Sequence, residues 1–251
     1  MEAVRERIEE DEKPCVSSEK REKRDKRVGI IAYLLFGISI LVSLYLLAYT
    51  PIHNWFHSIR MAEIIADYDQ KAAELSDEEL SAIREAALAY NSRLELGTHF
   101  QPTQKELDEY SAQLDFTGTG MMGYIQIPKL KVKLPIYHTT SEEVMEEAVG
   151  HIPGSSLPVG GVTCHTVLCA HRDLPTAYLF HDLDKLEMGD TFTLTVLDET
   201  VTYAVDQVTV VRPQDVEDLA IEPGQDYCTL VTCHPHGSSE FRMLVRGKRV
   251  A

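Results

Sequence analysis

Hydrophobic and polar positions follow three patterns along the chain. Residues 28–49 run for 22 positions without a charge, directly after a highly charged tail at residues 1–27 that we expect to be disordered. Residues 51–96 carry apolar side chains at helical spacing, including Ile64, Tyr68 and Leu75. From Met121 onward the apolar residues alternate at period two. The chain is therefore predicted to combine an apolar helix, further helices and a β domain.

The uncharged run is long enough to cross a bilayer, since a helix rises about 1.5 Å per residue. A cleaved signal peptide is the alternative, but its apolar region is usually shorter, roughly 7–15 residues. We predict an uncleaved anchor over residues 28–50, with membrane contact through that segment. Six basic residues lie between positions 20 and 27. The positive-inside rule places this flank and the tail 1–27 in the cytoplasm, and the rest outside the cell.

Residues 51–96 are predicted to form a helical stalk between the membrane and the β domain. A capping-box pattern at Ser76–Glu79 indicates that a new helix starts there and runs to about Leu96, before Gly97. Residues 97–120 form a long connector with a short helical stretch around 105–114. Connectors of that length are usually functional or disordered.

The β domain is predicted to occupy residues 121–251, with a short helix at 142–149. Seven or eight strands in about 130 residues indicate a barrel or a sandwich. The expected strands cover residues 124–128, 131–136, 162–170, 191–197, 201–211, 227–233 and 241–248.

Charge is unevenly placed. The formal net charge is −16, and residues 51–251 carry all of it because basic and acidic residues balance in the first 50. An acidic main domain argues against a nucleic-acid partner, since phosphate binding needs a basic face.

Five cysteines raise the question of disulfides. Cys15 is predicted to be cytoplasmic. Cys164 and Cys169 lie in one expected strand, roughly 16 Å apart, which is too far for a bridge between them. A bridge from either one to Cys228 across strands stays open, but small buried side chains in strands are the favoured interpretation.

Cys233 ends an apolar strand and precedes a His-Pro turn, so its side chain is expected at the rim of the fold. Alternation along the last strand puts Arg242, Leu244 and Arg246 on one face, with Arg242 close to Cys233 across the loop. A cation there lowers a thiol pKa or stabilises an oxyanion during acyl transfer. His171 ends another apolar strand and would meet Cys233 if the two strands are neighbours.

Two alternatives remain to the hypothesis that Cys233 is a nucleophile with His171 as its base. His236 could fold back to act as the base, whereas His234 should point to the opposite face from Cys233. A zinc site is the other alternative, although the cysteine spacings are wider than the usual zinc pattern. Its ligands would come from Cys164, His165, Cys169, His171, Cys233, His234 and His236.

Three stretches within residues 121–249, about half the chain, resemble the sortases, the membrane-anchored cysteine transpeptidases of Gram-positive bacteria. They are most similar to class C, the pilin-polymerising type. The stretches are MGYIQIP (122–128) with LPIYH (134–138), GHIPGSSLPVGG (150–161) leading to CAHR (169–172), and TLVTC (229–233) followed by RMLVRGKR (242–249).

The resemblance implies a mostly β fold, a closed eight-stranded barrel with short helices behind an N-terminal transmembrane helix and stalk. By position, Cys233 corresponds to the nucleophile, His171 to the catalytic histidine and Arg242 to the arginine. The implied substrate is a secreted or pilin protein with a C-terminal LPXTG-type sorting signal, cleaved between Thr and Gly through a thioester. The implied acceptor is an amine, usually a lysine of another pilin, and no metal or other cofactor is required.

The chain departs from the family pattern in two places. Asp173 stands where the family usually has glycine, and this carboxylate either orients His171 or is simply solvated. Class C sortases typically carry a lid with an Asp-Pro-aromatic motif, which the connector lacks. His99 and Phe100 occupy a plausible lid position, and a plain linker is the competing interpretation. Two other readings of the function stay open: a cell-wall precursor as the acceptor, and a non-catalytic, zinc-binding barrel that recognises a peptide.

Overall fold

The structure, a computed structural model, describes residues 15–250, with side chains from residue 21 onward except residue 22. The chain divides into two compact units, Met1–Pro51 and Ile52–Ala251. Helix α2 (Cys15–Ala73) contains the uncharged run, and by length and composition it is the one described helix able to cross a membrane. Residues 15–27, expected to be disordered, are helical, because their many Lys, Arg and Glu residues are good helix formers. The remainder of the predicted tail, residues 1–14, lies outside the described residues.

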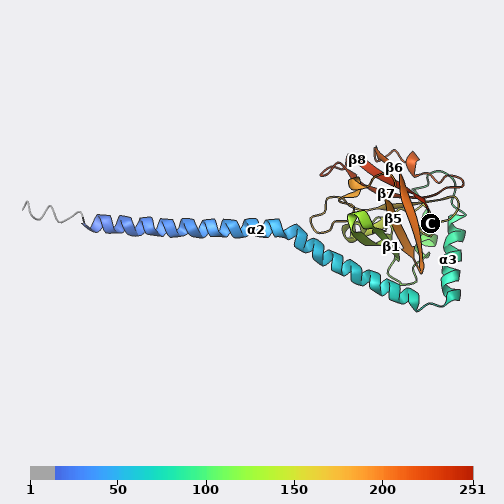
Figure 1. Ribbon diagram of the computed structural model, residues 1–251, viewed down its shortest axis with the longest axis horizontal. Coiled ribbons are helices and arrows are strands. Elements are labelled where there is room, and N and C mark those ends of the chain that lie inside the picture. Colours follow the sequence, from blue (N-terminus) through green and yellow to red (C-terminus); the bar gives the residue numbers. More distant parts are fainter. Residues whose placement is uncertain (1–14, 251) are drawn as a thin grey trace, which may run out of the picture. The chain divides into compact units, whose positions relative to one another are not determined.

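The second unit is built on a closed barrel whose strands follow the order β1-β2-β3-β4-β7-β8-β6-β5. This confirms the predicted eight-stranded barrel. Figure 1 labels five of these strands, with α3 (Asp77–Asn91) beside them. Two neighbouring pairs, β2 with β3 and β4 with β7, are parallel, and the others are antiparallel. The strands are β1 (Met121–Ile127), β2 (Val132–His138), β3 (Val149–His151), β4 (Cys164–Cys169), β5 (Thr191–Val196), β6 (Glu199–Val211), β7 (Asp226–His234) and β8 (Phe241–Arg249).

Short helices fill the connections. They are α3 (Asp77–Asn91), α4 (Gln104–Ser111), α5 (Glu142–Glu147) and the single 3-10 turns Pro128–Leu130, Leu183–Lys185 and Glu217–Leu219. Helix α3 begins at the predicted capping box, in which Ser76 and Glu79 bond to each other's backbone. It ends at Asn91, short of Leu96, and the buried Asn91 side-chain amide bonds both backbone groups of Leu157.

The helical segment 51–96 lies on the barrel rather than standing apart from it as a stalk. From α2, the side chains of Met61, Ile65 and Tyr68 are 1% exposed. The Tyr68 hydroxyl donates to the Met122 carbonyl oxygen (3.0 Å) and accepts from the Leu197 amide (2.8 Å). Tyr90 of α3 joins the barrel's main hydrophobic core. These apolar positions repeat at helical spacing because they form one buried face.

Side-chain alternation separates the barrel's interior from its outer face. On β7, Cys228 and Leu230 belong to the interior core, whereas Val231 belongs to a second apolar cluster outside. On β8, Met243 and Val245 face the interior and Leu244 faces the outer cluster, as the sequence pattern predicts. The candidate residues Cys233 and Arg242 therefore share the outer face with Val231 and Leu244.

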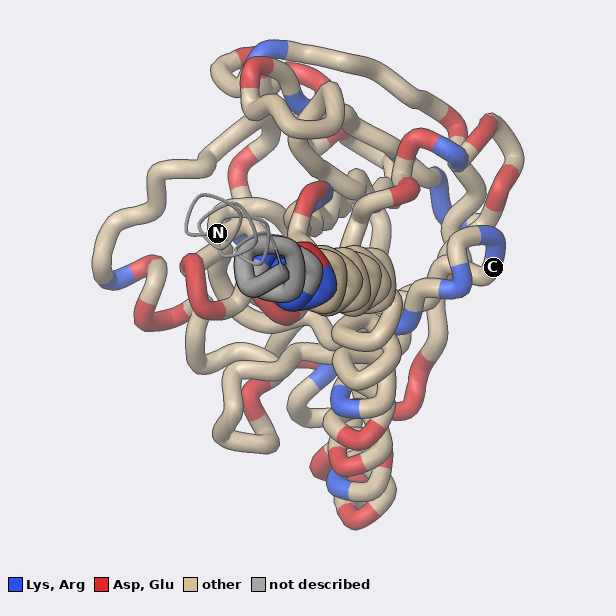
Figure 2. Tube along the Cα trace, turned by 90° about the vertical axis from the view of Figure 1, so that its left-hand side faces the viewer, with Lys and Arg blue, Asp and Glu red and all other residues tan. Residues whose placement is uncertain are grey.

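Figure 2 shows acidic residues at many positions along the trace of the second unit, interspersed with basic ones.

Candidate active site

Cys233 lies at the carboxyl end of β7, opposite Arg242 at the start of β8. The two residues are direct partners in the antiparallel register. Residues opposite each other in such a pair have Cβ atoms roughly 4.5–5.5 Å apart and project to the same side. Both side chains are half-buried, so each is held by the strand yet open to a substrate at the rim.

The Arg242 guanidinium is held by the loop that joins β7 to β8. Its Nη1 donates to the carbonyl oxygens of Ser239 (2.9 Å) and Phe241 (3.1 Å). Neither acceptor carries a charge, and the described residues give Arg242 no carboxylate partner within ion-pair distance. Its positive charge is therefore available to the thiol or to an oxyanion formed beside it.

His171 follows β4, the parallel neighbour of β7. Cys169 is aligned with Val231, and the contact continues because the Ala170 amide donates to the Val231 carbonyl (3.2 Å) and the Thr232 hydroxyl to the Ala170 carbonyl (2.8 Å). Two residues beyond that aligned pair stand His171 and Cys233, so the register brings them to one rim. Within residues 15–250 the half-buried His171 side chain has no hydrogen bond or ion pair, which leaves its ring nitrogens free for a substrate.

The other cysteines of the second unit are poor nucleophiles. Burial raises the pKa of Cys164 to about 11, and burial with the neighbouring Cys233 raises that of Cys169 to about 12. Burial also raises the pKa of Cys228 well above its ordinary value. These three cysteines and Cys233 are all free thiols, so the cross-strand disulfides left open by the sequence do not form.

An apolar cluster extends from the candidate pair along the outer face of the barrel. It contains Val167, Leu219, Val231 and Leu244, and Phe100 of the connector packs against it. The connector also packs closely against the barrel unit at Gly154, where a Cβ atom on residue 154 would overlap the His99 carbonyl oxygen. Phe100 therefore packs against a cluster in which Val231 and Leu244 lie two residues along the strand from Cys233 and Arg242.

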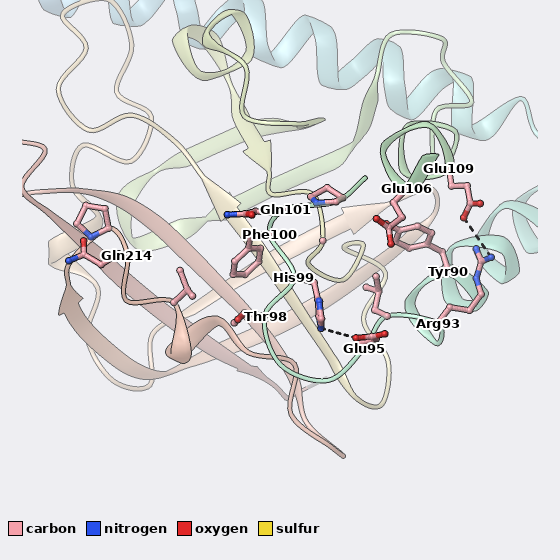
Figure 3. A pocket seen from close by; sticks show the side chains of 15 residues that line it. Tyr90, Arg93, Glu95, Thr98, His99, Phe100, Gln101, Glu106, Glu109 and Gln214 are labelled. Atoms are coloured by element: carbon pink, nitrogen blue, oxygen red, sulfur yellow. Dashed lines mark ion pairs between the residues drawn. The ribbon is translucent and has the colours of Figure 1, made fainter. Parts of the chain in front are cut away.

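Beside the connector lies a cavity of about 840 Å³ that contains neither Cys233 nor His171 (Figure 3). Phe100, His99 and Gln101 form one wall, and Gln214 lies on the side of the barrel strands. The His99 imidazole faces Glu95, with 3.3 Å between Nε2 and the carboxylate. The cavity flanks the connector, and the apolar cluster lies beneath Phe100.

Arg172 is a buried residue that sequence reasoning missed as part of the site. Its side chain is 1% exposed and forms an ion pair with Asp184 (2.8 Å). Its guanidinium donates to the carbonyls of His181 (3.3 Å) and Cys233 (3.5 Å). The same group fixes the backbone of Cys233 to the loop that follows His171. A charged residue directly after the apolar strand was visible in the sequence, but its partners come from three separate segments.

The Arg172 guanidinium also determines which ring nitrogens carry a proton in two histidines near Cys233. It lies 3.1 Å from His234 Nδ1 and 3.1 Å from His236 Nε2, and arginine can only donate. Each of these ring nitrogens must therefore carry a lone pair. His236 then donates its Nδ1 proton to Asp173 (2.6 Å). Neither histidine is placed as a free base for Cys233.

The structure gives Asp173 a partner other than His171. Its carboxylate accepts from His236 Nδ1 and from the Gly237 amide (2.7 Å). Partial burial alone would raise the pKa of Asp173, but these hydrogen bonds outweigh it and the net pKa is lowered. The carboxylate therefore fastens the β7–β8 loop and does not orient His171.

The zinc alternative is poorly matched by the described side chains. Among residues 15–250, the group with ligand atoms within 4.8 Å of one another is Asp173, His181 and His236. Only His236 belongs to the Cys/His set considered from the sequence. Both nitrogens of His236 are already engaged by Asp173 and Arg172.

Comparison with known proteins identifies this arrangement. Residues 125–250 match the sortase domain family. The chain belongs to the sortase family. It is thus a cysteine transpeptidase, and the strand ends that carry Cys233, Arg242 and His171 lie inside the matched region.

Solved sortases resemble the chain over most of its length. Sortase C1 from Streptococcus agalactiae is 46% identical and has a TM-score of 0.74, covering 75% of this chain and 98% of that one. Streptococcus pneumoniae sortase C is 39% identical with a TM-score of 0.69, covering 75% and 97%. A lid mutant of Corynebacterium diphtheriae sortase A is 36% identical with a TM-score of 0.66, covering 70% and 96%. The first two of these structures are class C sortases.

Replacing Arg172 of this sortase with methionine is expected to lower the free energy of unfolding by about 2–4 kcal/mol, because a buried charge-assisted network is lost. Chemical denaturation followed by circular dichroism measures this change. Arg212→Met, at an exposed arginine, is the matched control and should change stability by less than about 0.5 kcal/mol. Equal stabilities for the two variants would show that the Arg172 network does not hold the loops together.

Proposed function

We propose that this sortase cleaves an LPXTG-type sorting signal between Thr and Gly and joins the new acyl end to an amine, most simply a lysine of another pilin subunit. The proposal is carried by the strand register, which pairs Cys233 with Arg242 and aligns the end of β4, just before His171, with the end of β7. The likeness to sortases C supports the pilin assignment, since the solved Streptococcus pneumoniae enzyme is described with a pilin substrate specificity.

In the first half-reaction the Cys233 thiolate attacks the threonine carbonyl carbon. Arg242, opposite it in register, faces the oxyanion that forms. The C–N bond then breaks, and His171 gives a proton to the departing glycine amine, leaving a thioester on Cys233.

In the second half-reaction an acceptor amine attacks the thioester carbonyl. The sulfur leaves as thiolate, His171 takes the proton released by the amine, and an amide bond replaces the thioester. The cycle needs no oxidant, reductant or metal, and it regenerates the starting protonation states.

The N-terminal helix would tether this activity to the membrane. Under the proposal residues 28–50 cross the bilayer, the tail 1–27 stays in the cytoplasm, and the barrel lies outside the cell. Helix α2, which contains the uncharged run, supports this arrangement.

The identity of the acceptor is tested by supplying two amines. The protein is incubated with an LPXTG-type peptide and either a lysine-bearing pilin domain or a soluble cell-wall precursor peptide, and ligated products are weighed by mass spectrometry. Ligation to the pilin lysine supports the proposal. Ligation to the precursor alone would assign the enzyme to cell-wall anchoring instead.

We further propose that the connector acts as a lid through His99 and Phe100. Phe100 lies on the apolar cluster next to Cys233, where the substrate's apolar side chains would bind. The backbone at His99 is packed against Gly154, so the segment is seated on the barrel. The motif usual in class C lids is absent, and an aromatic contact takes its place.

Phe100→Ala is expected to increase the rate at which a thiol reagent labels Cys233 by about tenfold, because part of the apolar contact that seats the connector is lost. Labelling is followed by intact mass over time. Leu96→Ala is the control, since Leu96 is 56% exposed and outside the apolar cluster. Equal labelling rates in the two variants would show that the connector is a plain linker.

A further inference from the structure

Helix α2 has two opposite faces in the stretch that follows the apolar run. One face is docked on the barrel unit, with Met61, Ile65 and Tyr68 buried. Polar contacts extend the docking toward the helix start: Asn54 Oδ1 accepts from the Tyr178 amide (2.6 Å), and His57 Nε2 contacts the Glu147 carbonyl oxygen (2.7 Å). This face fixes the rotation of the helix about its own axis.

The opposite face carries four large apolar side chains that the described residues leave uncovered. Ile52, Trp55, Phe56 and Ile59 are 50%, 60%, 59% and 40% exposed. Their spacing of i, i+3, i+4 and i+7 makes one continuous stripe along two helical turns. The Trp55 and Phe56 rings lie 4.9 Å apart between centroids. We call these four residues the apolar stripe.

The apolar stripe follows the uncharged run closely in the sequence. It begins three residues after Tyr49, the last residue of that run. It ends at Ile59, because the next position on that face is Glu63, which is exposed and charged. The stripe is therefore about 10 Å long, at 1.5 Å per residue.

We propose that the apolar stripe lies in the interfacial layer of a lipid bilayer and seats the catalytic unit on the membrane surface. The inference rests on the proposed membrane anchor at residues 28–50. Tryptophan is the side chain most typical of this layer, because its ring is apolar and its N–H is polar. An interfacial helix buries one apolar face and presents its other face to water or protein. In this protein the other face of α2 packs against the barrel unit.

Seating the helix also positions the candidate active site. The Asn54 side chain is bonded to the backbone of Tyr178, on the segment that runs from His171 to His181. The Tyr178 and His181 rings stack at 5.0 Å, and His181 contacts the His236 ring at 4.7 Å. The membrane-facing helix is thus connected through side-chain contacts to both loops that flank Cys233. Membrane-bound substrates would meet this rim in a fixed orientation.

Trp55 is the chain's single tryptophan and reports directly on the stripe. The full-length protein is reconstituted in phosphatidylcholine vesicles, and its fluorescence is measured with nitroxide-labelled lipids and with acrylamide. We expect short-wavelength emission that shallow nitroxide lipids quench and acrylamide does not. Long-wavelength emission quenched by acrylamide would overturn the proposal, as would short-wavelength emission that no labelled lipid quenches, the result for a stripe covered by a second copy.

Vesicle flotation separates this inference from the anchor on which it rests. If the protein floats while Trp55 emits as if in water, the apolar stripe does not lie in the interfacial layer, and the proposed anchor stands. Protein that does not float contradicts both. The variant Phe56→Ser with Ile59→Ser should float, keep the wild-type circular dichroism and move Trp55 emission to longer wavelength. Leu88→Ser, on the exposed surface of α3, is the control and should leave the emission unchanged. Unchanged emission in the stripe variant would also count against the proposal.

Discussion

Cys233→Ala is expected to abolish transpeptidation, with no ligated product above the uncatalysed background. The thioester needs a sulfur at this position, and no neighbouring side chain can replace it. Cys169 is the nearest alternative thiol, but burial raises its pKa to about 12, so almost none is thiolate at neutral pH. Loss of the nucleophile in a comparable acyl-transfer site removes the rate enhancement by about 10⁶-fold.

The matched control for that variant is Cys169→Ala. It removes a thiol from the adjacent strand β4 and should retain most of the activity, because Cys169 only packs against the apolar cluster. Both variants are assayed for product with an LPXTG-type peptide and a saturating amine. An inactive Cys169→Ala beside an active Cys233→Ala would reverse the assignment of the nucleophile.

His171→Ala is expected to lower kcat by about 10²–10⁴-fold, the range for loss of a general acid and base. The effect should fall on kcat rather than on KM, because the ring serves proton transfer to and from the amine. Steady-state kinetics of peptide cleavage and transfer measure both constants.

His234→Ala and His236→Ala are the matched histidine controls and should each keep most of the wild-type kcat. Their ring nitrogens accept from Arg172, and His236 also donates to Asp173, so their roles are in loop structure. Circular dichroism checks that each variant is folded. A large loss in His236→Ala with little loss in His171→Ala would assign the base to His236.

Much of the barrel could be predicted because each long strand carries its own period. The extents of β6, β7 and β8 follow from apolar alternation, and the pairing of β7 with β8 follows from the short loop between them. Strand β3 (Val149–His151) was missed because three residues are too few to show a period. It is defined by its pairing with β2 and β4, which lies outside any local pattern.

In the candidate site, too, the part formed by neighbouring segments of the chain was predictable and the part formed by distant segments was not. Cys233 and Arg242 were predictable as opposite each other, since one short loop joins their strands. His171 lies at the same rim only if β4 and β7 are neighbours, and the sequence does not show which strands pair. The parallel pairing of β4 with β7 in the barrel meets this condition.

The role of Arg172 could not be predicted, because its partners Asp184, His234 and His236 are distant in sequence and give no spacing signal. The pairing of Asp173 with His236 was missed for the same reason. The helices at 51–96 were predicted as helices, but the barrel surface that buries Tyr68 and Asn91 becomes visible only when the sheet is closed.

The most direct test of the account is the intact mass of the full-length protein after mixing with an LPXTG-type peptide and no acceptor amine. We predict a mass increase equal to the acyl half of the peptide, absent in Cys233→Ala and more abundant in Phe100→Ala. An adduct that persists in Cys233→Ala, or none even when Phe100→Ala has loosened the connector, would contradict a thioester mechanism at Cys233.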